Sequence, residues 1–488
     1  QHRPSGKRVK FKAFILFTLP AFSFTFTGST LAWSSPAIPK FKNGDANVDI
    51  TDIQTSWVVA LHNAGALLGC YIGQVLNERV GRRRTFFAST VPALIGAVTM
   101  MVTRMPELMY VARTLMGLAT GVIAVVTMIY VTEISDKEIR GSLGTLVSVM
   151  NNVGALTIYS VGPFVSYMSL NGIILALPII FLILCSWIPE SPYFYLKEGK
   201  LELAKKEFMR LRQNTDENWV EEQMSEMRAH VKTSMENKTT FKELITNLKY
   251  RRAVYIVTGL KLLQYMTGIL VIQSYLEVIF RQTSSISGPY ASIIYGMVQL
   301  ASGLSATFVT RWCGRRILLL VSCTGVSVAM TLVGLYFLLK DTLHVTPETL
   351  ASVAWMPLVG MLGFNVTYSF GVGSLPYVLQ AELFPVNVKA VASSSATMLA
   401  CILGFIVTKC YQGVKDSFGH YTVFWSFALL GYVGIFFIYF FVPETKGKSL
   451  EEVQDYIQDK SPELKTQIEE EEALKGHDEE VGLKKIVE

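Results

Sequence analysis

The sequence predicts an all-α membrane protein with twelve transmembrane helices in two pseudo-symmetric six-helix bundles. The 488-residue chain is 51% hydrophobic and only 17% charged, whereas soluble domains carry about 25% charged residues. Its apolar residues run in blocks of about twenty, the length that a helix needs to cross a bilayer core. The two halves of the chain also carry similar charged motifs. These observations exclude a soluble enzyme, a nucleic-acid-binding module and a secreted disulfide scaffold.

Six apolar stretches precede a long charged segment, and six follow it. The first six cover residues 11–35, 54–76, 85–103, 107–132, 143–167 and 170–188. The second six cover residues 253–280, 288–310, 316–339, 350–380, 390–413 and 420–442. The first stretch is too long for a cleaved signal peptide, and no A-x-A cleavage site follows it. We therefore expect it to be a membrane span like the others.

The charged segment predicts how the chain is divided. Residues 189–252 hold 13 Lys+Arg and 11 Asp+Glu among 64 residues, which is typical of a solvated helical loop. We therefore expect an N-terminal six-helix bundle over 1–188 and a cytoplasmic helical loop over 189–252. A C-terminal six-helix bundle over 253–442 and a cytoplasmic tail over 443–488 follow.

The distribution of Lys and Arg predicts the orientation in the membrane. Cations cluster before span one, between spans two and three, after span four and between spans eight and nine, while the intervening loops hold few. Because basic loops stay on the cytoplasmic side, both termini are expected in the cytoplasm. The net charge of +6 comes from these helix ends rather than from a basic, aromatic-rich patch, so it indicates no nucleic-acid partner.

Charged motifs recur at equivalent places in the two halves. A Gly-Arg-Arg sequence follows span two, within residues 78–84, and another follows span eight, within 311–316. Span four ends in Glu133 and span ten in Glu382, and each acid is followed seven residues later by a cation. This recurrence indicates a duplicated six-helix unit. Such side chains can pair between helix ends and hold one side of a transporter shut until the pairs break.

Six short motifs follow one another along nearly the whole chain. They are Arg113-x-x-x-Gly117-x-x-x-Gly121, Tyr130-x-x-Glu133 with Arg140-Gly141, Pro189-Glu-Ser-Pro192, Gln264-x-x-Thr-Gly268, Glu382-Leu-Phe-Pro385 and Pro443-Glu-Thr-Lys-Gly447. In this order they resemble the sugar porter family of the major facilitator superfamily. The segment Trp33-Ser-Ser-Pro-Ala-Ile-Pro39 is similar to the branch that holds insect trehalose transporters.

The resemblance implies the major facilitator fold and a function in transport. The chain would carry a sugar, a hexose or trehalose, by facilitated diffusion through alternating access. Its partners would be the sugar and the lipid bilayer of the plasma membrane, and the monomer would be functional. Two readings of another kind stay open: a proton-coupled or anion-accepting solute carrier, and a transporter-like sugar sensor without net flux.

In the resembled family, charged residues at the cytoplasmic helix ends would form gating ion pairs. The matching residues are Glu78, Arg82, Glu133, Arg140, Arg315, Arg316, Glu382 and Lys389. The alternative role of the cations is to anchor helix ends on the cytoplasmic side. The second half departs from the family, since Arg311 stands where an acid is preferred and Lys389 replaces an Arg. Because lysine cannot form a bidentate fork, we expect the gating pairs of the second half to be weaker.

A sugar site needs hydrogen-bonding side chains and aromatic faces at mid-membrane depth, where polar groups are costly enough to be functional candidates. The candidates are Lys261, Gln264, Tyr265, Gln299, Ser148, Ser369 and Tyr377. Gln264 resembles the first amide of the family's Gln-Gln-x-x-Gly-x-Asn signature, but most of the other candidates depart from the family's usual residue. We therefore predict an altered substrate preference, with contacts between helices as the alternative role of these side chains.

Two features of the spans bear on the solute and on coupling. Lys261 is a lone cation inside span seven, so its amine either snorkels to the membrane surface or faces the cavity and favours an anionic solute. Residues 11–35 contain no Asp or Glu, whereas proton-driven members of the family keep an Asp there, so the resemblance favours facilitated diffusion. The sequence contains no nucleotide-binding glycine loop and no metal-ligand cluster. We therefore expect no catalytic residue, no metal, no cofactor and no enzyme activity.

Overall fold

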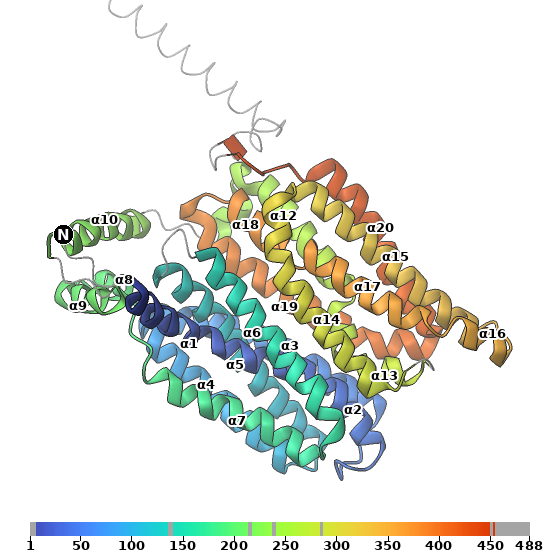
Figure 1. Ribbon diagram of the computed structural model, residues 1–488. Helices are drawn as coiled ribbons and strands as arrows, with labels where there is room; N and C mark the ends of the chain where they lie inside the picture. The colour runs from blue at the N-terminus through green and yellow to red at the C-terminus, as the bar shows by residue number, and fades with distance from the viewer. Residues whose placement is uncertain are drawn as a thin grey trace, which may run out of the picture.

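The computed structural model describes residues 6–134, 140–212, 217–236, 241–283, 286–448 and 452–453, and the regular structure in these ranges is entirely helical. Long helices lie side by side, and shorter helices lie at both ends of the bundle that they form (Figure 1). The helices of the first half are α1 (Gly6–Ala32), α3 (Asp52–Arg79), α4 (Arg82–Val102), α5 (Pro106–Ile134), α6 (Arg140–Val161) and α7 (Tyr167–Cys185). Each lies within a few residues of a predicted span.

The second half contains the six remaining predicted spans. They are α12 with α13 (Leu248–Met266, Ile269–Arg281), α14 (Gly288–Trp312), α15 (Arg315–Asp341), α17 with α18 (Met356–Phe370, Leu375–Leu383), α19 (Val386–Phe418) and α20 (His420–Phe441). Among the described residues, ten segments are long and apolar enough to cross a membrane. Helices α1 and α6 are not among the ten, although they are 27 and 22 residues long. The all-α membrane fold is thus confirmed, and length and composition support ten of its twelve spans.

Two spans of the second half are broken near their middle. Gly268 separates α12 from α13 with φ of 90°, a left-handed conformation that glycine adopts without a steric penalty. The turn 371–374 separates α17 from α18, and Pro376 lies in the first turn of α18, where its missing N–H costs nothing. The sequence predicts the break in span ten from its glycines and proline. The break in span seven was not predicted.

Helix packing relates the two halves to each other. The second span of each half packs against the fifth span of the other, since α3 lies against α19 and α14 lies against α6. A two-fold repeat produces this pairing. Within the first half, α3 and α5 approach so closely that a Cβ on Gly117 would lie 2.0 Å from the His62 carbonyl oxygen. The glycines of the motif at 113–121 therefore let two backbones touch. The boundaries predicted at residues 188 and 253 stay predictions.

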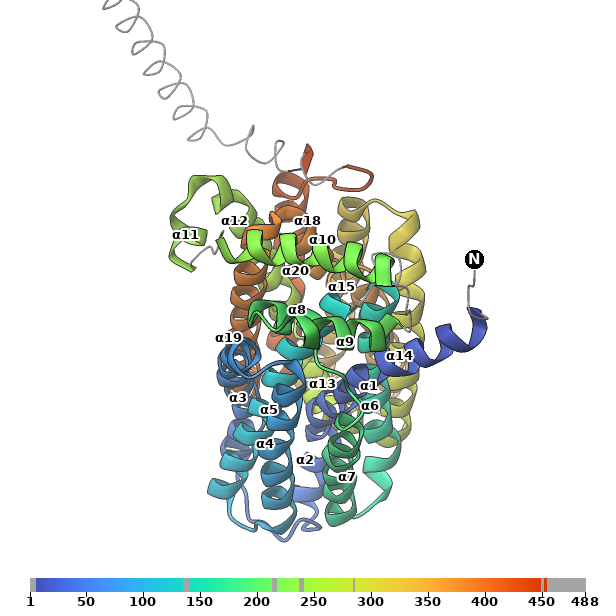
Figure 2. The same cartoon turned by 90° about the vertical axis from the view of Figure 1, so that its left-hand side faces the viewer.

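Short helices lie at the end of the bundle where α4 begins. They are α8 (Pro192–Lys197), α9 (Leu201–Arg212), α10 (Glu217–Glu236) and α11 (Phe241–Thr246), and Figure 2 shows them crossing that end. The amphipathic α9 and α10 pack on each other and on α8 through Ala204, Phe208, Val220 and Met224. At the opposite end, α2 (Ser34–Lys42) packs against α13, and α16 (Pro347–Ser352) precedes α17.

Candidate functional site

The predicted sugar-binding residues of spans seven and ten meet where both spans are broken. Gln264, at the end of α12, donates from Nε2 to the carbonyl oxygen of Gly373 in the turn between α17 and α18, over 2.8 Å. Tyr368 returns a hydrogen bond from its hydroxyl to the Gln264 carbonyl oxygen, at 3.3 Å. Gln264 is only 3% exposed. The structure thus places one predicted amide inside the bundle, beside main-chain groups that the helix breaks release.

Lys261 belongs to the same cluster. Its amine donates to Gln264 Oε1 over 2.9 Å and lies 3.4 Å from the centre of the Tyr377 ring. The residue is 1% exposed. Because Gln264 lies one turn nearer to the helix break, the amine points toward the middle of the span. The snorkelling of Lys261 to the membrane surface is therefore wrong. A cation against an aromatic face and an amide oxygen is stabilised without a carboxylate.

A second polar cluster joins α6, α14 and α17. The Asn152 side chain donates to the Gln299 carbonyl oxygen over 3.3 Å, and Ser302 donates to the Ser369 hydroxyl over 3.1 Å. The side-chain oxygen Oε1 of Gln299 is buried and has no hydrogen-bond partner in the part of the chain that the structure describes. A buried acceptor without a partner is costly, so this atom is available to a hydroxyl group of a ligand.

The other three predicted residues differ in how closely they join these clusters. Tyr377 contacts Lys261 but keeps 47% of its surface exposed. Tyr265 is half-buried and packs against the main hydrophobic core. Ser148 is exposed, and its hydroxyl donates to the Gly144 carbonyl oxygen of its own helix, at 3.4 Å. The structure therefore does not bring Ser148 together with the clusters around Gln264 and Gln299.

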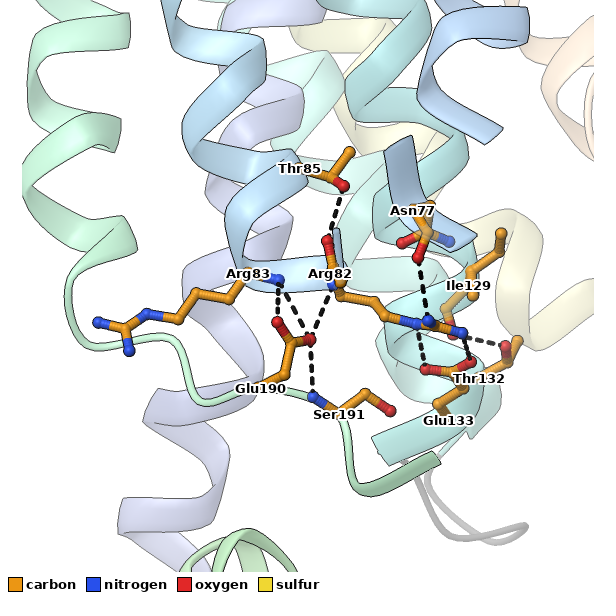
Figure 3. A network of polar contacts seen from close by, with 10 residues as sticks. Asn77, Arg82, Arg83, Thr85, Ile129, Thr132, Glu133, Glu190 and Ser191 are labelled. Carbon is orange, nitrogen blue, oxygen red and sulfur yellow. Dashed lines mark hydrogen bonds and ion pairs between the residues drawn. The ribbon is translucent and has the colours of Figure 1, made fainter. Parts of the chain in front are cut away.

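The first pair of predicted gating residues lies where α4 begins and α5 ends (Figure 3). The Arg82 guanidinium contacts the Glu133 carboxylate twice, with Nε 2.8 Å from Oε2 and Nη2 2.5 Å from Oε1. Its Nη1 donates to the Asn77 carbonyl oxygen over 3.0 Å. Arg82 is 2% exposed and the Glu133 side chain 14% exposed. We call Arg82 with Glu133 the N-terminal latch; it is a buried bidentate fork.

Glu190 caps the helix that carries Arg82. Its carboxylate accepts hydrogen bonds from the backbone N–H groups of Arg82, at 2.8 Å, and of Arg83 (Figure 3). A Cβ on Gly81 would lie 2.5 Å from Glu190 Oε2, so the preceding glycine leaves room for this approach. Burial raises the pKa of Glu190, and the backbone hydrogen bonds only partly oppose this effect. Our sequence analysis did not assign Glu190 a role, although the motif Pro189-Glu-Ser-Pro192 contains it.

The second half repeats this arrangement in a looser form. Arg315, at the start of α15, contacts Glu382 of α18 through one pair of atoms, Nη2 and Oε1, at 3.4 Å. The two side chains are 21% and 30% exposed. Thr445 donates from its hydroxyl to the other oxygen of Glu382 over 2.6 Å. We call Arg315 with Glu382 the C-terminal latch.

Glu444 caps α15 as Glu190 caps α4. It accepts hydrogen bonds from the backbone N–H groups of Arg315, at 2.9 Å, and of Arg316, at 3.1 Å. A Cβ on Gly314 would lie 2.4 Å from Glu444 Oε2. Burial alone would raise the pKa of Glu444, but the backbone N–H groups that bind it outweigh that effect and lower the pKa. This residue also lies in a quoted motif and was not assigned a role.

The four remaining gating candidates are Glu78, Arg140, Arg316 and Lys389. Glu78 is exposed, and Lys389 is exposed near the start of α19. The Arg316 guanidinium donates to the Tyr439 carbonyl oxygen and lies 5.1 Å from the centre of that ring. The side chain of Arg140 lies outside the described residues. Both described latches therefore join helices of one half and not helices of different halves.

Three hydrogen bonds between the halves lie toward the opposite end of the bundle. Tyr159 of α6 donates to the Gln273 carbonyl oxygen of α13 over 3.1 Å. The Lys409 amine of α19 donates to the Ser56 hydroxyl of α3 over 2.8 Å. The Glu277 backbone N–H donates to the Ser35 hydroxyl of α2 over 3.0 Å. These three hydrogen bonds join the two halves at this end. Toward the latch end, the Thr145 hydroxyl of α6 and the Thr307 hydroxyl of α14 also join them, at 3.3 Å.

Glu277 is a buried acid that our sequence analysis missed. It is 1% exposed, and its Oε1 accepts hydrogen bonds from Arg281 Nε, at 3.0 Å, and Nη2, at 2.7 Å. Its Oε2 has no partner in the described part of the chain. The signal in the sequence was Glu277 with Arg281 at a spacing of four in an apolar span, which is typical of an ion pair on one helix face.

Comparison with known proteins agrees with this geometry. Residues 13–456 match the family model described as sugar (and other) transporter. The chain is 31% identical over 430 residues to a facilitated trehalose transporter Tret1 of Bombyx mori, covering 88% of this chain and 83% of that protein. It is also 31% identical over 431 residues to a Tret1 of Apis mellifera ligustica, covering 88% and 84%.

Solved structures of a xylose transporter share the fold. The structure is similar to the proton:xylose symporter XylE, of the major facilitator superfamily, bound to 6-bromo-6-deoxy-D-glucose, with a TM-score of 0.72 and 19% identity over 91% of this chain and 98% of the other. It is equally similar to the inward-open conformation of XylE from E. coli, with a TM-score of 0.72 and 19% identity over 92% and 99%. The predicted major facilitator fold is thereby confirmed.

Proposed function

The chain belongs to the sugar transporter family, and on this premise we propose that it carries a hexose or trehalose across a membrane by facilitated diffusion. The observation that carries this proposal is the similarity to facilitated trehalose transporters along 88% of the chain. The resemblance drawn from the sequence motifs is confirmed at the level of the family. The substrate is our proposal, because it is taken from the names of those relatives.

The sugar would bind between the two broken spans of the second half and the first half. Main-chain groups released by broken helices are tolerated at membrane depth where they are buried in protein or line a cavity, and many transporters bind their substrate at such breaks. Gln264 lies at one break, and Gly373 lies at the other. The Oε1 atom of Gln299 is an acceptor without a hydrogen-bond partner among the described residues, and it is three residues before Ser302. A bound sugar would replace the bonds that Lys261 and Gly373 now make with the Gln264 amide.

Alternating access is supported by the positions of two kinds of contact. The latches lie at one end of the bundle, and three hydrogen bonds between the halves lie at the other. The hydrogen bonds from Tyr159, Lys409 and Ser35 close one end of the pathway. The described latches at the other end hold each half together internally. We therefore propose that this structure is closed at the end of α13 and less firmly closed at the end where α4 begins, where Thr145 and Thr307 join the halves.

The surroundings of a buried cation in α5 support facilitated diffusion rather than proton coupling. Arg113 is 1% exposed and donates to the carbonyl oxygens of Val58, at 3.1 Å, and Thr30, at 2.9 Å. Its guanidinium also lies 5.0 Å from the centre of the Trp33 ring. These partners are neutral and do not bind or release a proton. Residues 11–35 contain no Asp or Glu that could act as a proton carrier.

The chain is an integral, multi-pass membrane protein, and we propose its placement as follows. The plasma membrane would hold it as a functional monomer, with both termini in the cytoplasm. The alternation of basic and cation-poor loops supports this orientation. In this orientation, helices α8 and α9 and the two latches lie on the cytoplasmic side. Helix α2 and the loop at 342–346 lie outside.

Uptake by purified protein in liposomes tests the proposed function. Labelled glucose and labelled trehalose are offered separately, with and without an imposed pH gradient. Saturable uptake of one sugar that is indifferent to the gradient is expected. Uptake that concentrates sugar along the proton gradient would show coupling and contradict facilitated diffusion. No uptake of either sugar by correctly folded protein would contradict the proposed substrates.

Single substitutions test the central cluster. Gln264→Ala and Gln299→Ala are expected to reduce uptake at least tenfold, because each removes an amide that would bond to the sugar, worth about 1.5 kcal/mol. Gln223→Ala, a glutamine of α10 far from the cluster, is the matched control. Uptake unchanged from the control, at equal amounts of folded protein, would remove both residues from the site.

A further inference from the structure

A cavity lies in the first half at the end of the bundle where α4 begins, apart from the central cluster. Its volume is about 280 Å³, and it opens between α4 and the short helices α8 and α9. Its cationic lining residues are Arg83, Arg84 and Lys200, and its aromatic ones are Phe87, Phe194 and Tyr195. The transport mechanism uses none of these side chains.

The acids that line the cavity already have partners. Glu190 binds the backbone N–H groups at the start of α4. Glu198 contacts the Lys200 amine at 2.8 Å. Glu207 lies 3.7 Å from Arg210, and its Oε2 is buried without a hydrogen bond to any described residue. Among the described residues, no carboxylate of the lining therefore forms an ion pair with the guanidinium of Arg83 or Arg84.

The two arginines keep donors that the described chain does not use. Arg83 donates from Nη2 to the Ser186 carbonyl oxygen over 2.9 Å, but its Nε is buried and has no partner among the described residues. Arg84 is exposed, and no carboxylate in the described ranges pairs with it. Adjacent guanidinium groups with free donors match the oxygens of a phosphate group.

The surface next to the cavity is apolar and faces the membrane. From Arg84 and Phe87, the exposed face of α4 continues through Val91, Ile95 and Val98, which are 55%, 52% and 47% exposed. The spacing of three and four residues places them on one stripe. A phosphate bound at the two arginines would thus lie at the head of an apolar stripe that runs into the bilayer.

Helix α7 supplies a second stripe beside the first. It packs against α4, and its exposed apolar residues include Ile180 and Ile183, with Trp187 just beyond its end. A tryptophan at this position is typical of the boundary between membrane and water. A soluble phosphate compound would leave both stripes unused, whereas a phospholipid would use the stripes and the arginines together.

We propose that this cavity binds the phosphate group of a membrane phospholipid through Arg83 and Arg84. The acyl chains lie along the stripes of α4 and α7, in the leaflet on the side where α4 begins. Phe87 lies at the junction between headgroup and chains. A free phosphate compound shares the headgroup chemistry, so the test separates the two sources.

The test measures binding of a fluorescent phosphatidylglycerol to the purified full-length protein in detergent micelles. The double variant Arg83→Gln/Arg84→Gln is expected to bind at least tenfold more weakly, because it removes two charge-assisted contacts. Arg251→Gln/Arg252→Gln removes an adjacent arginine pair at the start of α12, outside the cavity, and is expected to bind as the unaltered protein does. Arg84→Gln alone, at an exposed position, is expected to weaken binding if the double variant does not fold.

Two further ligands decide between the sources. Diacylglycerol with the same chains but no phosphate is expected to bind at least tenfold more weakly than phosphatidylglycerol. Inorganic phosphate and ATP are expected not to displace the lipid at equal concentration. Arginine-dependent binding of ATP without binding of lipid would overturn the proposal in favour of a soluble phosphate. Equal lipid binding by the arginine variants, or equal binding of diacylglycerol, would overturn it outright. Because the readout is binding, it does not depend on which sugar the protein carries.

Discussion

The N-terminal and C-terminal latches use the same residue types at equivalent helix ends, but they differ in burial and geometry. Arg82 and Glu133 form two contacts of 2.5 and 2.8 Å in a nearly dry environment. Arg315 and Glu382 form one contact of 3.4 Å between partly exposed side chains. The caps differ as well, because the pKa of Glu190 is raised and that of Glu444 is lowered.

The difference shows that a shared motif does not fix the strength of an ion pair. Removing one partner of a buried pair costs about 3–5 kcal/mol, since the other charge is left buried. An exposed pair contributes about 0.2–1 kcal/mol. We therefore expect the N-terminal latch to act as a permanent part of its half. We expect the C-terminal latch to be weak enough to open and close during transport.

The largest expected effect is that of Arg82→Gln compared with Arg315→Gln. Removal of Arg82 leaves Glu133 buried without its partner, so the free energy of unfolding should fall by about 3–5 kcal/mol. Removal of Arg315 should cost about 1 kcal/mol or less. Chemical unfolding of both variants in the same detergent measures the difference. Equal losses would show that burial does not separate the two latches.

The next effect is that of Gly81→Ala compared with Gly314→Ala. Both substitutions bring a Cβ against a capping carboxylate, at 2.5 and 2.4 Å. Gly81 also has φ of 98° and ψ of 167°, a region that costs other residues about 1–3 kcal/mol, whereas φ at Gly314 is −66°. The alanine at 81 should therefore lower the melting temperature more. A larger loss at 314 would mean that the collision, not the backbone, dominates.

A smaller expected effect is that the contributions of Glu190 and Glu444 to stability depend on pH in opposite directions. Because the pKa of Glu190 is raised, its charged form opposes folding, and its contribution to stability falls as the pH rises above 4.5. Because the pKa of Glu444 is lowered, its contribution is present above 4.5 and is lost as the pH falls below that value. At neutral pH, Glu444→Gln should cost about 1 kcal/mol, and Glu190→Gln should cost less.

Melting temperatures of both variants across the acidic range measure this difference. The deficit of Glu444→Gln relative to the unaltered protein should shrink as the pH falls below 4.5. The deficit of Glu190→Gln should instead be smallest near neutral pH. The same pH profile for both variants would contradict the opposite environments of the two caps.

The smallest expected effect is that of Lys389→Arg, which tests whether residue type explains the weak second half. The sequence attributes the weakness to lysine at this position, but the structure shows an exposed side chain. Replacement of one cation by another at an exposed position should change the free energy of unfolding by no more than about 0.5 kcal/mol. A gain well above that value would make the missing arginine, rather than exposure, the cause of the difference.

The sequence predicted the features that depend on local patterns. Apolar blocks located every described span within a few residues. The recurring motifs selected Arg82, Glu133, Arg315 and Glu382 as candidates for ion pairs, but which of them pair came from the structure. The break at 371–374 followed from its glycines and Pro376. The break at Gly268 was missed, because a single glycine in an apolar run does not distinguish a left-handed residue from a close helix contact.

Features that depend on packing of distant segments were not predictable. Glu190 and Glu444 lie far along the chain from the helices that they cap, and no periodicity joins them. The direction of the Lys261 side chain depends on where Tyr377 packs, which only the tertiary structure decides. Whether any of the central residues binds sugar stays a prediction.

The close approach of α3 and α5 has a mechanical consequence. Where a Cβ on Gly117 would lie 2.0 Å from a main-chain oxygen, no flexible side chain remains between the helices to absorb a displacement. We therefore expect the two helices to move as one rigid body. Bending should then occur in the interrupted segments around Gly268 and 371–374. Spin labels on α3 and α5 should then keep a constant separation under conditions that change the separation between α3 and α13.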